Sequence, residues 1–326
     1  APFEKTDIQT IQQTFQVNVF APMLLLQSVF AHLDATKKCH VVNIGSMGGF
    51  QGSIKFPGLA TYSASKAALA NLTECLAEEY KGKNVFVCFQ ATFMQRAIDQ
   101  IFHDICYTKV PITIVSARSG FSGYDGPTHH GIYDFGFLRT LPNIEIFYAG
   151  TKRDLKAILE ERYRNAKSPM IILHPYELIS PLQDQFLPKK ISPLDRMECV
   201  EEGTEGIIIA LGNKLIDAIN LKKMLFEKKK QNFAVYNLRW VNPLPIKDLK
   251  FLLRKYKKAI TLEESVKNGG IGTAINDFAC SEKIDCRIYV SAIENKFLPA
   301  GNKQELSELA EIDVKSIFQQ LESFWR

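Results

Sequence analysis

The apolar residues of the first 84 positions follow two helical patterns separated by one short continuous run. Over residues 7–33, and again over residues 61–80, they recur three and four positions apart, which predicts two amphipathic helices. Residues 40–45 form a short apolar run typical of a buried strand, and a loop rich in glycine follows it. This part of the chain is therefore expected to fold as helix, strand, helix.

From residue 85 onward, continuous apolar runs alternate with helical patterns. Such runs are typical of a parallel sheet that is covered on both faces. The expected strands are residues 85–89, 112–116, 144–148 and 169–173, and the expected helices are residues 95–107 and 152–164. A polar loop with several turn residues, 118–131, interrupts the pattern, and loops of this length in a compact domain are usually functional.

A polar stretch with prolines, residues 181–204, is expected to be a linker to a second α/β unit. Beyond it the pattern predicts strands at 206–212, 233–238 and 259–263, with a helix at 246–256. We therefore expect an α/β protein in three parts, residues 1–84, 85–190 and 191–326.

Composition excludes several classes of protein. Apolar residues make up 46% and charged residues 23% of the 326 positions, which is typical of a globular domain. The net charge is +5 with scattered basic residues, so no nucleic-acid surface is expected, and no apolar run is long enough to span a membrane. Seven dispersed cysteines and the lack of a secretory signal favour a cytoplasmic protein with reduced thiols. Because the first residue is Ala1, the sequence is expected to lack its true beginning.

A first set of candidate residues lies in the N-terminal part. Tyr62 and Lys66 are four positions apart and therefore share one face of the predicted helix. A nearby cation stabilises a phenolate, which brings tyrosine closer to acid/base chemistry at neutral pH. Ser46 follows the predicted strand and is a candidate to hold a substrate carbonyl. The alternative for this spacing alone is an ordinary exposed helix face.

Three segments in this part, Asn18-Val, Val42-Asn-Ile-Gly-Ser46 and Tyr62-Ser-Ala-Ser-Lys66, resemble the short-chain dehydrogenase/reductase family in the expected order. The resemblance covers residues 1–84 and implies an oxidoreductase that uses NAD(P) on a Rossmann-like fold. It implies that Tyr62 is the general acid/base, that Lys66 lowers its pKa, that Ser46 orients substrate and that Asn18 supports a proton-relay water. No glycine precedes Gly45, so the glycine-rich turn that binds a dinucleotide is expected to be absent.

A second set of motifs spans residues 85–326. Ala91-Thr-Phe-Met-Gln-Arg96, Asp125-Gly-Pro-Thr-His-His-Gly131, Leu262-Glu-Glu264 and Phe297-Leu-Pro-Ala-Gly301 resemble the transketolase group, and within it the deoxyxylulose-phosphate synthases. The resemblance implies a partial pyrimidine-binding domain, a transketolase C-terminal domain and thiamine diphosphate with Mg²⁺ as cofactors. The whole chain is thus expected to be a hybrid of two truncated parallel-sheet folds followed by a C-terminal α/β domain.

The same resemblance implies roles for five residues. Phe93 would stack on the aminopyrimidine of the cofactor with Arg96 beside it, while Arg118, Asp125 and His129 would line the substrate channel. In that channel His129 would donate or accept a proton, and Arg118 would contact an anion. Without the resemblance, these residues are equally typical of a core phenylalanine, a surface arginine and a solvated turn.

Three positions depart from the transketolase pattern. Ala68 stands near the place of the catalytic glutamate, Gln90 replaces a channel tyrosine, and Leu173-His-Pro-Tyr176 replaces an Arg-Tyr-Pro-Arg stretch that holds a phosphate. The domain that holds Mg²⁺ and the cofactor diphosphate is also expected to be absent, so we expect a separately encoded diphosphate-binding partner.

Three classes of function therefore stay open. The first is ketol transfer on a sugar phosphate or keto acid, with a homodimer formed through the C-terminal domain. The second is NAD(P)-dependent oxidoreduction at Tyr62 and Lys66. The third is a non-catalytic hybrid or dimerisation module, including a mis-joined product without activity.

Overall fold

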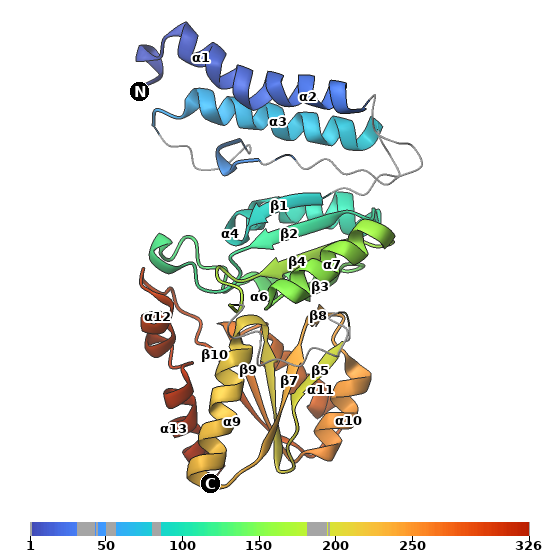
Figure 1. Cartoon of the computed structure of the whole chain (residues 1–326), viewed down its shortest axis with the longest axis vertical. Helices are drawn as coiled ribbons and strands as arrows, with labels where there is room; N and C mark the ends of the chain where they lie inside the picture. The colour runs from blue at the N-terminus through green and yellow to red at the C-terminus, as the bar shows by residue number, and fades with distance from the viewer. Residues whose placement is uncertain are drawn as a thin grey trace.

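Three units follow one another along the long axis of the molecule (Figure 1). The computed structural model describes residues 2–30, 43, 45–49, 57–79, 86–180, 194 and 196–325. A layer of helices lies at the N-terminal end, a first sheet with its helices lies in the middle, and a second sheet with its helices carries the C-terminus. Among the described residues, no helix combines the length and apolar character needed to cross a bilayer.

The N-terminal layer is built from two long helical stretches. The first runs without a break through α1 (Ile8–Phe15), the π-helical η2 (Gln16–Phe20) and α2 (Ala21–Phe30), and it packs on α3 (Ala60–Glu79). The Asp7 carboxylate caps the first stretch by accepting a hydrogen bond from the Thr10 N–H at 2.7 Å. Both predicted helices are confirmed over the described residues, whereas the strand expected at 40–45 lies mostly outside them.

The first sheet has the strand order β1-β2-β4-β3-β8. Its four parallel strands form where apolar runs were predicted, and the fifth strand is antiparallel: β1 (Phe86–Gln90), β2 (Thr113–Ala117), β3 (Glu145–Tyr148), β4 (Met170–His174) and β8 (Trp240–Asn242). Gln90 lies beside Ala117, and Ala117 lies beside His174, so three parallel strands end at the same level.

Helical segments connect these strands. The chain is helical from residue 91 to residue 107, so helix follows β1 directly, four positions earlier than the sequence pattern predicts. The segments of this region are α4 (Ala91–Met94), η4 (Gln95–Ala97), α5 (Ile98–Gln100), η5 (Ile101–Tyr107), α6 (Asp134–Leu138) and α7 (Lys152–Asn165).

The second sheet has the order β10-β9-β6-β7-β5, and all strands except β5 are parallel. Its strands are β5 (Met197–Glu201), β6 (Gly206–Leu211), β7 (Phe233–Leu238), β9 (Lys258–Val266) and β10 (Arg287–Ile293). Strand β5 falls inside the stretch expected to be a linker, so that expectation is wrong for residues 197–201; residues 181–193 lie outside the described part.

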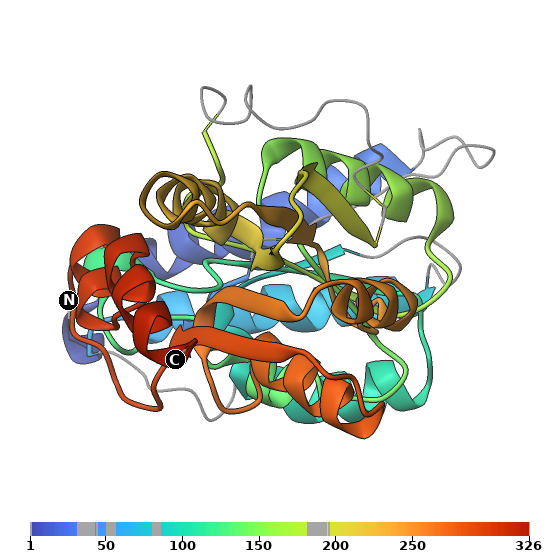
Figure 2. The same ribbon diagram turned by 90° about the horizontal axis from the view of Figure 1, so that it is seen from below.

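Helices cover both faces of the second sheet (Figure 2). Ile207 and Ile209 of β6 share one apolar cluster with α10 and α11, while Ile208 and Ala210 share another with α9 and α13. Because successive residues of β6 point to opposite faces of the sheet and both faces pack on helices, β6 is confirmed as a strand buried on both sides. The helices are α9 (Leu215–Lys229), α10 (Ile246–Lys255), α11 (Ile271–Ser281), α12 (Lys303–Leu309) and α13 (Val314–Phe324).

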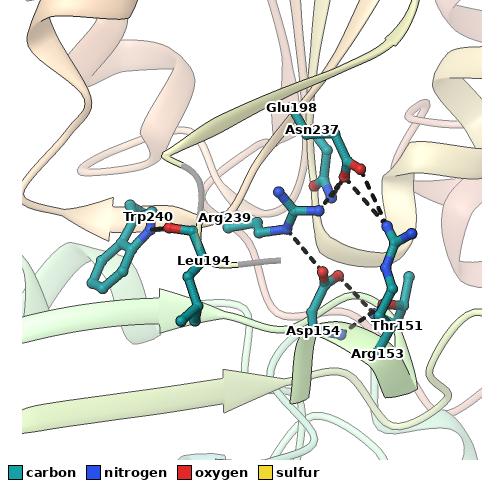
Figure 3. Close-up of polar contacts among 8 residues, drawn as sticks. All are labelled: Thr151, Arg153, Asp154, Leu194, Glu198, Asn237, Arg239 and Trp240. Atoms are coloured by element: carbon teal, nitrogen blue, oxygen red, sulfur yellow. Dashed lines mark hydrogen bonds and ion pairs between the residues drawn. The ribbon is translucent and has the colours of Figure 1, made fainter. Parts of the chain in front are cut away.

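A buried group of charged side chains lies where the two sheets meet (Figure 3). The Arg239 guanidinium donates to Asp154 Oδ1 at 2.8 Å and to the Glu198 carboxylate, and Arg153 Nη2 donates to Glu198 Oε1 at 3.2 Å. Burial raises the pKa of Glu198, and Arg239 and Arg153 partly offset that rise. Since unpaired buried charges are costly, the pairing fixes how the two sheets sit against each other.

Candidate functional site

The transketolase-like candidates gather beyond the carboxyl ends of three neighbouring strands. Phe93 lies on α4 just after β1, Arg118 follows β2 directly, and Tyr176 lies two residues after β4. Because these strands are parallel and end at the same level, the segments that follow them leave the sheet at one edge. In open α/β sheets this edge is the usual place for a ligand.

Phe93 and His129 are in direct contact. Their ring centroids are 5.1 Å apart with an interplanar angle of 76°, an edge-to-face arrangement. The Thr128 hydroxyl lies 2.9 Å from His129 Nδ1, and both rings are half-buried. The structure therefore brings together the predicted cofactor-contacting phenylalanine and the predicted proton-transfer histidine.

Arg118 is oriented by two neighbours. Its backbone adopts φ +65°, in the left-handed region, and its guanidinium forms an ion pair with the Asp125 carboxylate. The same guanidinium lies 4.6 Å from the centroid of the Tyr176 ring. Arg118 and Asp125, both expected to line a substrate channel, are thus paired with each other, and Tyr176, which sequence analysis missed, lies against the guanidinium as an aromatic surface.

Arg96 lies three positions after Phe93 in η4 and is exposed. On the same strand-to-helix turn, the Gln90 Nε2 and Thr92 Oγ1 atoms are buried and have no hydrogen-bond partner in the described part of the chain. Buried polar atoms without a partner are uncommon in folded proteins. This turn therefore combines an accessible aromatic ring with polar atoms free to bind a further group.

Two buried residues that were not predicted as site residues hold loop 118–131 in place. His130 Nδ1 accepts from the Ser122 N–H at 3.0 Å, so the ring proton lies on Nε2, which is 2.9 Å from the Pro299 carbonyl. Glu264 accepts from the Phe121 N–H at 2.7 Å and from Asn213 Nδ2 at 2.9 Å. The adjacent histidines and the Leu262-Glu-Glu264 motif were the only signals in the sequence for these contacts.

Asp134 is a further buried group that sequence analysis missed. The Ser119 hydroxyl donates to Asp134 Oδ2 at 3.0 Å, and the Tyr148 hydroxyl donates to the Ser119 carbonyl at 2.9 Å. Burial raises the pKa of Asp134 to about 7, although hydrogen bonds from Ser119 and Gln95 act in the opposite direction. Asp134 thereby links the loop that carries Arg118 to the helical segment that carries Phe93.

The dehydrogenase-like candidates lie apart, in the N-terminal layer. Lys66 Nζ is 5.9 Å from the centroid of the Tyr62 ring, as the shared helix face predicts. Asn18 Nδ2, however, donates to Ser65 Oγ at 3.0 Å, and Ser46 Oγ accepts from the Gly48 N–H at 3.3 Å. The structure therefore pairs Tyr62 with Lys66 but engages Asn18 and Ser46 elsewhere.

The described residues offer neither the expected catalytic glutamate nor a metal-binding cluster. The position expected for a catalytic glutamate is occupied by Ala68, which is half-buried on α3. No group of three or more histidine, cysteine, aspartate or glutamate side chains able to hold a metal ion occurs within the described ranges. The residues present thus favour contacts to an aromatic ring and an anion.

Family comparisons find three matches along the chain, of which the first two overlap over residues 76–95. Residues 1–95 match short chain dehydrogenase, residues 76–180 match the transketolase pyrimidine-binding domain, and residues 195–317 match the transketolase C-terminal domain. These matches agree with the two resemblances recognised in the motifs.

Curated relatives agree with the second and third matches. The chain is 34% identical over 240 residues to 1-deoxy-D-xylulose-5-phosphate synthase of Lawsonia intracellularis, which covers 73% of this chain and 37% of that enzyme. It is 30% identical over 238 residues to the synthase of Carboxydothermus hydrogenoformans, covering 73% of this chain and 38% of that enzyme. The chain thus spans less than two-fifths of the length of these relatives.

Solved structures agree on the fold. A split gene transketolase, described as an inactive β4 tetramer, superposes with a TM-score of 0.66 at 20% identity over 96% of this chain and 97% of its own. A transketolase mutant from Pichia stipitis gives a TM-score of 0.63 at 16% identity over 81% of this chain and 37% of its own. Residues 76–180 and 195–317 therefore match the pyrimidine-binding and C-terminal domains of the transketolase family, behind an N-terminal segment that matches short-chain dehydrogenases.

Proposed function

We propose that this chain supplies the pyrimidine-binding half of a thiamine-diphosphate-dependent ketol-transfer site. The observation that carries the proposal is the Phe93–His129 ring contact beside the Arg118–Asp125 ion pair, at one edge of a parallel sheet. An aromatic ring, a proton-transferring imidazole and an anion-binding guanidinium are among the protein groups that this chemistry uses.

The turn after β1 fits the aminopyrimidine ring of thiamine diphosphate. Phe93 offers an aromatic surface for stacking, and Gln90 Nε2 and Thr92 Oγ1 are buried polar atoms without a partner in the described structure. When bound, the cofactor supplies the carbon nucleophile that attacks a 2-keto donor. Phe93 would hold the ring with Arg96 beside it, and no described residue group would hold Mg²⁺.

On the substrate side, this chain offers one proton-transferring group and one oriented cation. His129 Nδ1 is engaged by Thr128, which leaves Nε2 for a proton exchange with substrate. Arg118 would bind the phosphate or carboxylate, and Asp125 and Tyr176 fix its orientation. Because Leu173 and Tyr176 stand where the synthases have two arginines, the acceptor is a sugar phosphate or keto acid whose anion is bound by Arg118 without those two arginines.

The remaining half of the site would come from a second polypeptide that binds the diphosphate and Mg²⁺. Support comes from the fold similarity to a split gene transketolase along nearly the full length of both chains. We also propose a homodimer through the C-terminal domain.

A reconstitution experiment tests this function. The chain is mixed with the part of the Carboxydothermus hydrogenoformans synthase that it does not match, and thiamine diphosphate binding in Mg²⁺ is followed by fluorescence quenching and near-UV circular dichroism. Saturable binding is expected only when both polypeptides are present. Phe93→Ala is expected to weaken it about tenfold through loss of stacking, while Phe102→Ala, an exposed ring elsewhere on the same helical stretch, leaves it unchanged. Equal binding by wild type and Phe93→Ala contradicts the proposal.

The contact between Tyr62 and Lys66 favours a second candidate, NAD(P)-dependent oxidoreduction. Titration of the chain alone with NADPH, followed by cofactor fluorescence, tests it. Saturable binding that Lys66→Met weakens supports this candidate, and the absence of binding removes it.

A further inference from the structure

The outer face of α10 carries a local excess of positive charge. α10 carries four lysines and arginines and one acid, Asp248, and of these cations Lys250 forms an ion pair with Glu282 of the neighbouring chain segment. Lys247, Arg254 and Lys255 therefore leave a local positive excess on this helix. A surface that concentrates the excess in one place attracts an anionic partner.

An exposed aromatic ring lies at the centre of this charge. The Phe251 side chain is 68% exposed. Lys247 and Lys250 lie four and one positions before it, and Arg254 and Lys255 lie three and four positions after it, so these four cations share its part of the helix surface. The inner face of α10 is already buried through Leu249, Leu252 and Leu253. Phe251 thus lies on the outer face of α10, which we call the basic face, where a partner would meet one apolar anchor among cations.

The chain itself carries a matching surface at the end of α12. Leu309 is 50% exposed, with Glu305 four positions and Glu308 one position before it, and with Glu311 and Asp313 after it. Residues 302–313 contain these four acids and one cation, Lys303. Glu305 and Glu308 thus precede Leu309 by the same numbers of positions by which Lys247 and Lys250 precede Phe251. We call this surface the acidic corner.

The two surfaces of one molecule cannot meet. α10 packs on the sheet face that carries Ile207 and Ile209, whereas α13, which follows the acidic corner, packs on the opposite face with Ile208 and Ala210. Figures 1 and 2 both show α12 and α13 far from α10. A contact between the basic face and the acidic corner must therefore join two molecules.

We propose that a second copy of this chain docks on the basic face through its acidic corner, with Leu309 of the second copy against Phe251. Opposite charges meet in this arrangement, while contact of two basic faces would oppose like charges. The contact is heterologous, so a pair of molecules keeps one basic face and one acidic corner free for further copies unless a ring closes.

Other occupants fit the basic face less well. Insertion into a lipid surface needs an apolar helix face, and that of α10 is already used in the core, which leaves Phe251 almost alone. From Lys247 to Lys255 the face spans only about 12 Å, too short for the many phosphate contacts of a nucleic-acid site.

Two charge-reversed variants test the proposal. Variant one combines Lys247→Glu with Arg254→Glu, and variant two combines Glu308→Lys with Glu311→Lys; all four side chains are exposed. A control, Lys156→Glu with Lys223→Glu, reverses the same charge on α7 and α9, where both lysines are exposed by more than 70%. Circular dichroism checks that each variant folds, and sedimentation velocity measures association over a range of protein concentrations and salt.

Wild type and control are expected to associate with increasing concentration, and more weakly as salt rises from about 50 to 500 mM. Each variant alone is expected to need about tenfold more protein or more for the same association, since like charges then face each other. An equal mixture of the two variants is expected to associate again, because opposite charges meet in both possible contacts. That recovery distinguishes a lost contact from a misfolded chain.

Three results would overturn the proposal. One is a wild-type mass that does not grow with concentration beyond that of the proposed homodimer at low salt. Another is a variant that associates like the control. The third is a wild type that does not self-associate but binds anionic lipid vesicles or polyuridylate through Lys247 and Arg254, which would assign the basic face to another partner. None of these results depends on the proposed ketol transfer, because no cofactor or substrate enters the experiment.

Discussion

Arg239 Nε donates to Asp154 Oδ1 over 2.8 Å, and both side chains are fully inaccessible to solvent. Asp154 belongs to the helix after β3, and Arg239 lies between β7 and β8, so this bond joins the two halves of the transketolase-like region. Asp154 is already fixed by its own helix, because its carboxylate and the Thr151 hydroxyl form a capping box.

Arg239→Met is expected to lower the free energy of unfolding by about 3 to 5 kcal/mol, because it leaves Asp154 and Glu198 as buried anions without this cation. Urea unfolding measures the change. Arg164→Met, which alters an exposed arginine in an i,i+4 pair with Glu160, serves as control and is expected to change stability by less than about 0.5 kcal/mol. Equal effects of the two substitutions would contradict a structural role for the buried pair.

Asp134→Asn is expected to flatten the pH dependence of stability. Since burial raises the pKa of Asp134 from 3.8 to about 7, the folded state binds this proton more tightly than the unfolded state. The contribution of Asp134 to the free energy of unfolding is complete below pH 4 and is lost as pH rises to about 7. Between pH 4 and pH 8 the free energy of unfolding of the wild type should therefore fall by roughly 2 to 4 kcal/mol relative to that of the variant. Thermal unfolding across this range tests the difference, with the exposed Asp248→Asn as control; parallel profiles for Asp134→Asn and wild type would refute it.

Gly212→Ala is expected to destabilise the junction of the two sheets. Gly212 has φ +62°, and a Cβ there would lie 2.1 Å from Cε1 of the Tyr148 ring. Strain and overpacking together are expected to cost about 2 to 4 kcal/mol. Gly136→Ala is the control, because the nearest atom to its Cβ is the Asn268 carbonyl oxygen at an ordinary 3.5 Å. If both variants melt at the wild-type temperature, the backbone of Gly212 is not confined as described.

Glu263→Gln is expected to loosen the start of α11. The Glu263 carboxylate accepts from the Ile271 N–H at 2.8 Å and from the Gly272 N–H at 2.7 Å, and also from the Ser265 hydroxyl. An amide has one acceptor oxygen, so one backbone N–H loses its bond at a cost of about 1 to 3 kcal/mol. Faster hydrogen exchange of these two amides is the expected signature. Glu294→Gln, on an exposed side chain, should leave their exchange unchanged.

Seven of the eight parallel strands in the described part of the chain could be predicted from sequence because each is a continuous apolar run, as in Ile171-Ile-Leu173 of β4. The exception is β10, which mixes polar with apolar residues and was missed. The edge strands β5 and β8 could not be predicted either, since each is short and mixes polar with apolar residues, and only pairing with a distant strand makes it extended. The helical segment α4, which begins directly after β1 at Ala91, was also missed, because the sequence pattern placed the start of the helix at residue 95.

Some residues of the candidate site could be predicted from sequence and others could not. Phe93, Arg118, Asp125 and His129 were found through motifs, and the structure brings them together in two pairs. Tyr176, Asp134, His130 and Glu264 were missed as site residues because their roles depend on contacts between separate segments. The bond from the Phe121 N–H to Glu264, for example, joins residues 143 positions apart.

Strand β8 is the edge strand of the first sheet beside β3, but it comes from the region of the chain that builds the second sheet. While the chain is being synthesised, β3 has no neighbour on this side until residues 240–242 have left the ribosome. An open strand edge is a site for unwanted pairing with other chains. The order of synthesis therefore makes this edge the vulnerable point of the nascent protein. Chains stalled while residues 240–242 are still inside the ribosome should aggregate more readily in a translation extract than chains stalled after these residues have emerged.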